Sequence, residues 1–521
     1  MKGTGNPGLA VRLAMAMFVF VIDTSLMNVS ISAVVHDLHT TTSGVQSAIA
    51  IEALVSAAFI LIGSKIADLW SRKRAYILGL ILYAVGAIAM TLAQGLAAII
   101  VFWAVIGGLG ASLYFPAMQA LIHGNFEGKA QVRVYALAGA AAAVGAAVGP
   151  LIGGFLTTLL SWRIGFLLEA VIIVVVLSGS GLIRDVPYTG DRGIDVVGSV
   201  LSVLGMGCLV LGILAWQEGG ESVAALLAVG LIGLGALVWW LRRRKRQGKP
   251  VLLDPDLFRI KLFSFGLAAG VLQQIALGGL LIALPLYLQL DLGYNALQAG
   301  LSLAPLSLTV FGVALLAGKR AGKRRQSALI RAGFALLAVG VLLLIPFVPR
   351  VESGWYLVLP LVLAGAGLGL LVSQINSYTL SPVDEERAGE ASGVNSAVSS
   401  FGLSVGLAFA GAILLAALSI AFTNKAEDSK VLTPAQQQRV ADTLEDDAQL
   451  MSDAQLNELL AGQPKATRDE IVSINDDARP EALQFGLLVP LVAAVLGLLA
   501  SFPMMRLPDP VPSDAADRSL S

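Results

Sequence analysis

The chain is built from long apolar runs separated by short polar segments. A helix needs about 20 consecutive apolar residues to cross a hydrocarbon core of about 30 Å. Runs of that length predict 14 membrane-spanning helices, near residues 10–32, 45–66, 75–94, 97–121, 133–159, 164–183, 196–215, 222–241, 263–285, 297–317, 328–347, 355–376, 392–420 and 483–504. We therefore expect an all-α integral membrane protein.

Composition supports this fold class. The 521 residues are 56% hydrophobic and only 13% charged, whereas soluble domains carry about 25% charged residues. The 56 glycines lie within the apolar runs, where small residues let helices approach closely. Because Cys208 is the single cysteine, we expect no disulfide framework and no cysteine metal site. The run Leu9–Ile31 is long enough to span and lacks a cleavage site, so no signal peptide is expected.

Basic residues alternate between the loops and indicate the orientation. Counted from an inside N-terminus, the short outside loops hold little beyond Arg163 and Arg350. The inside loops hold Arg72, Lys73, Arg74, Lys129, Arg133, Arg184, Arg192, Arg242 to Arg246, Lys249, Lys319, Arg320, Lys323, Arg324 and Arg325. The positive-inside rule therefore predicts a plasma (cytoplasmic) membrane protein with both termini in the cytoplasm.

One outside segment, residues 421–482, is long and acidic. Thr433 opens the stretch TPAQQQRVADTL, whose spacing predicts short amphipathic helices on the outer surface. We favour a solvated cap for this segment over a role in gathering cationic substrates.

Two segments have spacings that suggest moving helix contacts. The loop GSKIADLWSRKR runs from Gly63 and contains Asp68, Arg72, Lys73 and Arg74. An acid followed by a basic cluster at a cytoplasmic helix end can form a charge clamp that holds or breaks as two halves rock. A plain positive-inside loop would explain the basic residues but not Asp68.

The second segment is GAAVGPLIGG in the fifth span, which contains Gly145, Gly149, Pro150, Gly153 and Gly154. Glycines four apart lie on one helix face and allow very close helix contact, while a proline removes a backbone donor. Generic small-residue packing does not readily explain this full spacing.

These segments resemble the major facilitator superfamily, and within it the 14-span drug:proton antiporter family. The loop resembles that superfamily's motif A, and the glycine segment matches its antiporter motif C. The first span, VIDTSLMNVSIS, resembles the family signature through Asp23, Thr24 and Asn28. The stretches SWRIGF, PVLLDPDLF, LYLQLDLGYNALQAG and GEASGVNS extend the likeness almost end to end.

The chain also departs from the family pattern. Motif A has Ser64 and Ser71 where glycines are usual and Leu69 where a basic residue is usual. In the fourth span, Ala104 and Gly107 occupy the positions of the family's arginine and glutamine. The embedded arginine that the family ties to proton transfer is therefore absent.

The resemblance implies two six-helix bundles, within residues 1–190 and 251–521, joined by a membrane hairpin within 191–250. It also implies a substrate cavity near the midplane that rocking exposes to each side in turn. The expected activity is proton-driven export of hydrophobic or cationic small molecules by a monomer in the lipid bilayer. The proton gradient supplies the energy, so no cofactor is expected, and no nucleic acid partner.

Three acids lie within predicted spans: Asp23, Glu52 and Glu169. Such groups are costly in lipid and usually mark an ion or substrate route. Counted from the outer span ends, they lie at similar depth, so they can share one region and exchange a proton for a cation. Glu169 has two other possible places, at the outer interface or paired with Arg163.

Other embedded polar residues are candidates for lining a substrate cavity or for bonding across helices. They are Asn28, Tyr114, Gln119, Gln273, Gln274, Gln374, Asn376 and Asn395. The three histidines are scattered, so no metal site is expected.

Two alternatives to broad export stay open. One is a dedicated exporter of a single metabolite or peptide, and the other is a membrane sensor or scaffold that no longer transports. An enzyme is not expected, because the inside loops carry no phosphate-binding loop, nucleophile elbow or His-Glu metal motif.

Overall fold

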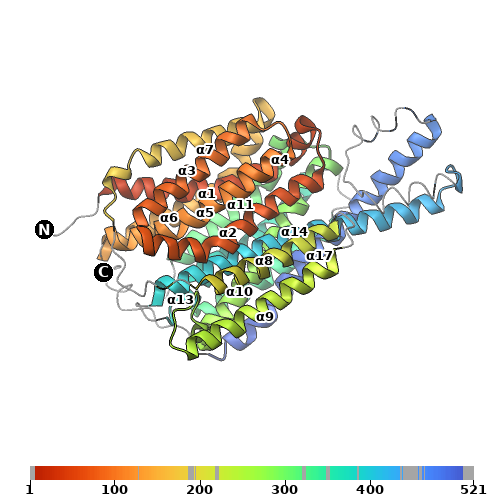
Figure 1. Ribbon diagram of the computed structural model, residues 1–521. Helices are drawn as coiled ribbons and strands as arrows, with labels where there is room; N and C mark the ends of the chain where they lie inside the picture. Colours follow the sequence, from red (N-terminus) through yellow and green to blue (C-terminus); the bar gives the residue numbers. More distant parts are fainter. Residues whose placement is uncertain are drawn as a thin grey trace.

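A computed structural model shows an all-helical chain (Figure 1). It describes every residue except 1–5, 127, 186–192, 194, 218–221, 320–323, 348–352, 384–386, 435–436, 438–455, 457–459, 461, 463 and 508–521. The described part of the chain contains 14 helical segments long and apolar enough to cross a membrane, so the predicted number of spans is confirmed. We call the side of the α1–α2 connection "outer" and the opposite side "inner".

The first six spans form one bundle. They are α1 (Pro7–Leu38), α2 (Thr42–Trp70), α3 (Arg72–Leu92), the continuous α4 (Leu96–Ala98), η1 (Ile99–Gly107) and α5 (Gly108–Asn125), α6 (Gly128–Leu159), and α7 (Trp162–Leu177) with η2 (Ser180–Leu182). Within the bundle α1 packs along α6, and α3 packs against both α5 and α7.

A hairpin and a second bundle follow. The hairpin is α8 (Val196–Gln217) and α9 (Val223–Arg246), which pack against each other. After η3 (Pro255–Arg259), the second bundle contains α10 (Lys261–Leu286) with η4 (Tyr287–Asp291), α11 (Ala296–Lys319), α12 (Gln326–Phe347), η5 (Gly354–Leu357) with α13 (Val358–Leu380), α14 (Ala388–Asp428) and α17 (Lys465–Met504).

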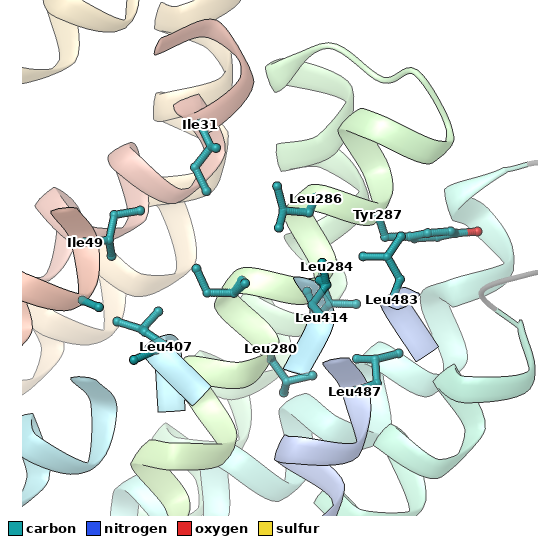
Figure 2. Close-up of a cluster of buried hydrophobic side chains, with 14 of the residues drawn as sticks. Ile31, Ile49, Leu280, Leu284, Leu286, Tyr287, Leu407, Leu414, Leu483 and Leu487 are labelled. Atoms are coloured by element: carbon teal, nitrogen blue, oxygen red, sulfur yellow. The ribbon is translucent and has the colours of Figure 1, made fainter. Parts of the chain in front are cut away.

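Two pairs of helices join the bundles: α6 packs on α11, and α2 packs on α14. A cluster of buried apolar side chains joins the outer half of the first bundle to the second. In the close-up of this cluster, Ile31 of α1 and Ile49 of α2 lie near side chains of the second bundle such as Leu286 and Leu407 (Figure 2). Dense apolar packing of this kind holds the outer halves together.

The inner half of the first bundle has its own core. Its buried apolar residues extend from Leu9 of α1 to Ile183 after α7, and none comes from the second bundle among the residues described. The larger apolar cluster that includes both bundles therefore lies on the outer side, whereas on the inner side Leu61 of α2 packs against a smaller cluster of the hairpin and the second bundle.

Helices α14 and α17 are much longer than the predicted spans 392–420 and 483–504. They contain 41 and 40 residues, which at 1.5 Å per residue is about 60 Å, twice the hydrocarbon thickness. Both extend beyond the bundles on the outer side (Figure 1). Their extensions are amphipathic: Ala426, Ile471 and Ile474 are buried, so they do not stand out in hydropathy. The predicted helix from Thr433 lies mostly outside the described residues.

A buried acid fixes the hairpin at the inner side. Asp195 is 2% exposed and accepts hydrogen bonds from the Trp240 indole at 2.9 Å, the Gly198 amide at 3.0 Å and the Leu252 amide at 3.3 Å. These bonds tie the start of α8 to α9 and to the segment that leads into α10.

An ionic network continues this anchor. Asp254 pairs with Lys245 of α9 and with Arg387, at 2.6 Å, beside the start of α14, and its backbone amide donates to Glu390. Lys245 also binds Asp256, and this hydrogen bond lowers the pKa of Asp256 below its ordinary value. The network therefore fastens the hairpin to the second bundle.

Candidate functional site

Asp23 lies in the middle of α1 and inside the first bundle, where it is 1% exposed. The Tyr83 hydroxyl of α3 donates to its Oδ2 at 2.6 Å. The Trp103 indole of η1 donates to Oδ1 at 3.0 Å and to Oδ2 at 3.1 Å. Both carboxyl oxygens are therefore satisfied by neutral donors from two other elements.

Glu169 of α7 lies next to Asp23. It is 1% exposed, and its carboxyl group is close enough to that of Asp23 for the two to interact. No other protein donor reaches either of its carboxyl oxygens among the residues described. Two carboxyl groups can hydrogen-bond to each other only when one carries a proton, so this contact is a place where a proton can be held.

Glu169 neither lies at the outer interface nor pairs with Arg163, the two alternatives expected from the sequence. Arg163 pairs instead with Asp37 at the outer end of α1 and donates to the Ala93 carbonyl at 2.7 Å. The Trp162 indole also donates to Asp37, at 3.0 Å. Glu169 therefore faces the bundle interior rather than the outer interface.

Glu52 of α2 completes the set. It is 8% exposed, accepts a hydrogen bond from Ser56 at 3.2 Å, and is near enough to Asp23 for their charges to interact. The structure thus brings together Asp23, Glu52 and Glu169, which we call the acid cluster.

Aromatic rings enclose the acid cluster. Tyr83 and Tyr114 meet edge to face with ring centroids 5.5 Å apart, and Trp103 meets Phe166 in the same way at 6.2 Å. The Tyr114 hydroxyl is buried and has no hydrogen-bond partner among the residues that the structure describes. Such rings shield the acids from water and strengthen each hydrogen bond in the cluster.

Sequence reasoning missed Tyr83 and Trp103. Each is an aromatic residue with one polar atom inside an apolar run, which is also how lipid-facing anchors look. One feature of the sequence could have pointed to Trp103. It directly precedes Ala104, the position at which the family has an arginine.

A π-helix positions Trp103. Residues Ile99–Gly107 form the π-helical segment η1, between the α-helical α4 and α5. π-Helical turns shift the facing of side chains relative to an α-helix and are frequent at functional sites. Here Trp103 points to Asp23 while Ala104 is fully buried.

The acid cluster contains no basic partner. No Lys or Arg forms an ion pair with these acids in the part of the chain that the structure describes, and their recorded neighbours are tyrosines, a tryptophan, a serine and each other. An uncompensated buried carboxylate is strongly disfavoured. The arrangement can therefore take up a proton or a cation.

The glycine segment of α6 packs as its spacing predicts. Gly145, Gly149 and Gly153 face α1, and a methyl group added to Gly149 would lie 2.5 Å from Cβ of Ser25. Gly154 faces the other bundle, because its added methyl group would lie 2.4 Å from the Ala296 carbonyl of α11.

On the α11 side of this contact, a glycine also allows close approach of the backbone. A methyl group on Gly300 of α11 would lie 2.3 Å from the Pro150 carbonyl, and the Leu297 amide donates to Thr158 at 3.0 Å. Such close backbone approach is possible only for residues without a side chain.

Comparison with known proteins now identifies the family. The profile of the Major Facilitator Superfamily matches residues 13–407. The chain belongs to this superfamily. The probable actinorhodin transporter of Streptomyces coelicolor is 28% identical over 418 residues, covering 78% of this chain and 72% of that protein.

A second relative and a solved structure agree with this membership. The multidrug resistance protein Stp of Mycobacterium tuberculosis is 28% identical over 445 residues, covering 84% of this chain and 81% of that protein. A bacterial homologue of the human lysosomal transporter Spinster aligns with a TM-score of 0.61 at 13% identity, covering 96% of this chain and 97% of that chain. The structural likeness concerns the fold alone.

In this Major Facilitator Superfamily chain, the inner loop between α2 and α3 binds within the first bundle. Asp68 pairs with Arg72 at 2.9 Å, and the Lys73 ammonium donates to the Ile183 carbonyl at 3.0 Å. The Arg74 amide donates to Ser71. Gly63 packs closely on α5, where an added methyl group would lie 2.2 Å from a backbone carbonyl. That the charge clamp of this loop forms and breaks as the two bundles rock stays a prediction.

The amide candidates fall into separate places. Asn28 donates to the Thr24 carbonyl of its own helix at 2.7 Å, and Gln119 is half-buried on α5.

In the second bundle, Asn395 donates to Asn376 at 2.8 Å, which joins α14 to α13. Gln273 donates to its neighbour Gln274, and Gln374 donates to Ser373. The second bundle thus offers neutral amides, whereas the first offers acids.

Proposed function

We propose that this protein is a proton-coupled antiporter that exports hydrophobic or cationic small molecules by alternating access. Membership of a transporter superfamily supports the general class. The multidrug resistance protein and the probable actinorhodin transporter among its relatives support export of bulky organic compounds.

The observation that carries the proposal is the acid cluster without a basic partner. Asp23, Glu52 and Glu169 lie together in a shielded interior. Removing carboxylates from water favours their neutral forms, and a second nearby acid favours them further. Uptake of a proton on one side of the membrane and its release on the other can therefore be coupled to rocking of the bundles.

The bundle contacts support alternating access. The close glycine contact of α6 with α11 lies toward the outer ends of both helices, while the inner half of the first bundle has a separate core. These contacts support a state closed on the outer side. Separation of the outer halves would give the opposite state.

Transport by purified protein in proteoliposomes tests the proposal. With ethidium and tetraphenylphosphonium as probes, we expect substrate-dependent proton flux in the wild type and its loss in Asp23→Asn. Asp256→Asn makes the same chemical change in the inner segment η3, away from the acid cluster, and should keep the flux. Full proton-coupled transport by Asp23→Asn would overturn the role of Asp23.

A dedicated exporter is a second candidate, favoured by the relative named for one compound, actinorhodin. Counterflow with a panel of dyes, quaternary ammonium compounds and polycyclic aromatic acids separates the two candidates. Broad recognition shows as exchange with several probes, and narrow recognition as exchange with one.

A further inference from the structure

The geometry points to two positioning residues: Tyr83 and Trp103 hold Asp23 in place of an embedded cation, and Asp23 and Glu169 hold one proton between them. This inference rests on the proposed proton coupling and names the side chains that set it. Neither aromatic residue carries a charge, so Asp23 is held by neutral hydrogen-bond donors and not by an ion pair.

The donors on Asp23 are arranged for a carboxylate. Tyr83 and Trp103 come from α3 and η1, both side chains are less than 5% exposed, and together they supply one hydrogen bond to Oδ1 and two to Oδ2. Hydrogen bonds to the ionised form favour that form. The aromatic pair therefore stabilises the ionised form of Asp23.

Glu169 has the opposite surroundings. Both of its carboxyl oxygens are buried without a hydrogen-bond donor among the described residues, and the neighbouring polar group is the Asp23 carboxyl. A protonated Glu169 can donate its O–H to the ionised Asp23, which satisfies one orphaned atom without any added group. The proton is therefore held on the Glu169 side of the contact. Its release breaks one O–H bond, leaves both carboxylates ionised and requires no other reactant.

The ionisable groups around Asp23 and Glu169 are all acids or tyrosines in the part of the chain that the structure describes. The ionisable side chains that face Asp23 are Glu52 from α2, Tyr83 from α3, Tyr114 from α5 and Glu169 from α7. Residues 138–159 of α6, 262–286 of α10 and 296–317 of α11, which also pack against α1, contain no ionisable side chain. Loss of the proton therefore leaves net negative charge in the first bundle, and rebinding a proton or a cation relieves it.

Infrared titration of the purified full-length protein tests this without a substrate. The carbonyl stretch of a protonated carboxyl group is followed over pH in the wild type, Asp23→Asn and Glu169→Gln. We expect a pH-dependent band that disappears in Glu169→Gln. Each variant is combined with Glu52→Gln, so that a protonated Glu52 cannot supply the band. A band that then persists in Glu169→Gln, or the absence of any such band at all pH values, would overturn the shared proton.

The positioning role has a matched control on the same helix. Tyr83→Phe removes a hydroxyl bound to Asp23, whereas Tyr76→Phe removes a buried hydroxyl that has no hydrogen-bond partner. Loss of one hydrogen bond to a carboxylate should move the titration midpoint about one pH unit upward in Tyr83→Phe, with no change in Tyr76→Phe. Trp103→Phe should move it in the same direction.

Equal midpoints in Tyr83→Phe and Tyr76→Phe would show that Tyr83 is only a packing residue. Tyr83→Phe keeps the ring, so folding is preserved for this comparison even if Trp103→Phe misfolds. Failure of the proposed antiport is a separate result, because it would appear as absent proton flux in wild-type proteoliposomes whatever the infrared midpoints are.

Discussion

At the residue scale, the acid cluster shows how neighbours give similar side chains different tasks. Asp23 has three hydrogen bonds from neutral donors, Glu52 has one from Ser56, and Glu169 has Asp23 itself. Hydrogen bonding stabilises the ionised form, and burial without donors stabilises the neutral form. The three acids should therefore respond differently to the loss of a charge or of a donor.

Glu52→Gln should shift the pH dependence of transport in the opposite direction to Tyr83→Phe. The substitution removes an ionisable acid near Asp23, so wherever Glu52 would carry a charge the remaining pair binds its proton less tightly. We expect the pH of half-maximal export to fall in Glu52→Gln and to rise in Tyr83→Phe. Initial rates of dye export, measured in steps of about half a pH unit from about pH 5.5 to about pH 8.5, a range on either side of neutral pH, test both shifts. Shifts of the same sign would contradict this view.

At the element scale, the contact between α6 and α11 depends on the absence of side chains. Gly154→Ala places a methyl group 2.4 Å from a backbone carbonyl, whereas Gly139→Ala on the same helix meets nothing within 4 Å. Backbone cannot move aside cheaply, so the outer halves should separate more often in Gly154→Ala.

A disulfide cross-link reports this separation. Thr158 and Leu297 lie across the contact and are joined by a hydrogen bond, so cysteines at both positions, with Cys208 replaced, should cross-link in the wild-type background. We expect a several-fold lower rate with Gly154→Ala and an unchanged rate with Gly139→Ala. An unchanged rate in both would show that the glycines are not needed for closure.

The buried acid Asp195 anchors the start of the hairpin. Asp195→Ala leaves the indole of Trp240 and two backbone amides without their acceptor, and each such loss costs about 1–3 kcal/mol. We expect unfolding free energy to fall by about 3 kcal/mol in detergent. Ser199→Ala removes a neighbouring hydroxyl that donates to the Asp195 carbonyl and should change stability by about 0.5 kcal/mol or less.

At the scale of the whole molecule, 14 spans place the start of α1 and the end of α17 on one side. The basic inner loops predict that this side is the cytoplasm. Alkaline phosphatase fused at the C-terminus should therefore be inactive, whereas the same enzyme inserted after Lys430, between α14 and α17, should be active. Activity at the C-terminus would reverse the orientation and the direction of proposed export.

The fold class and the number of spans were predictable because lipid imposes a local requirement. A span must be apolar over a set length, and each run reports this by itself. The three acids were also visible, since charged residues stand out in such runs. The outer ends of α14 and α17 were not, because their amphipathic turns are stabilised by packing on each other rather than by lipid.

Tertiary structure alone decided the partners of these residues. Nothing local indicates that Tyr83 and Trp103 face Asp23. The same holds for Glu169, which turns inward while Arg163 binds Asp37. It also holds for Gly154, which faces α11 while Gly153 faces α1. The facing of a side chain depends on the rotation of its whole helix, including the π-helical turns of η1. That rotation is set by packing against neighbouring helices that are far away in the sequence.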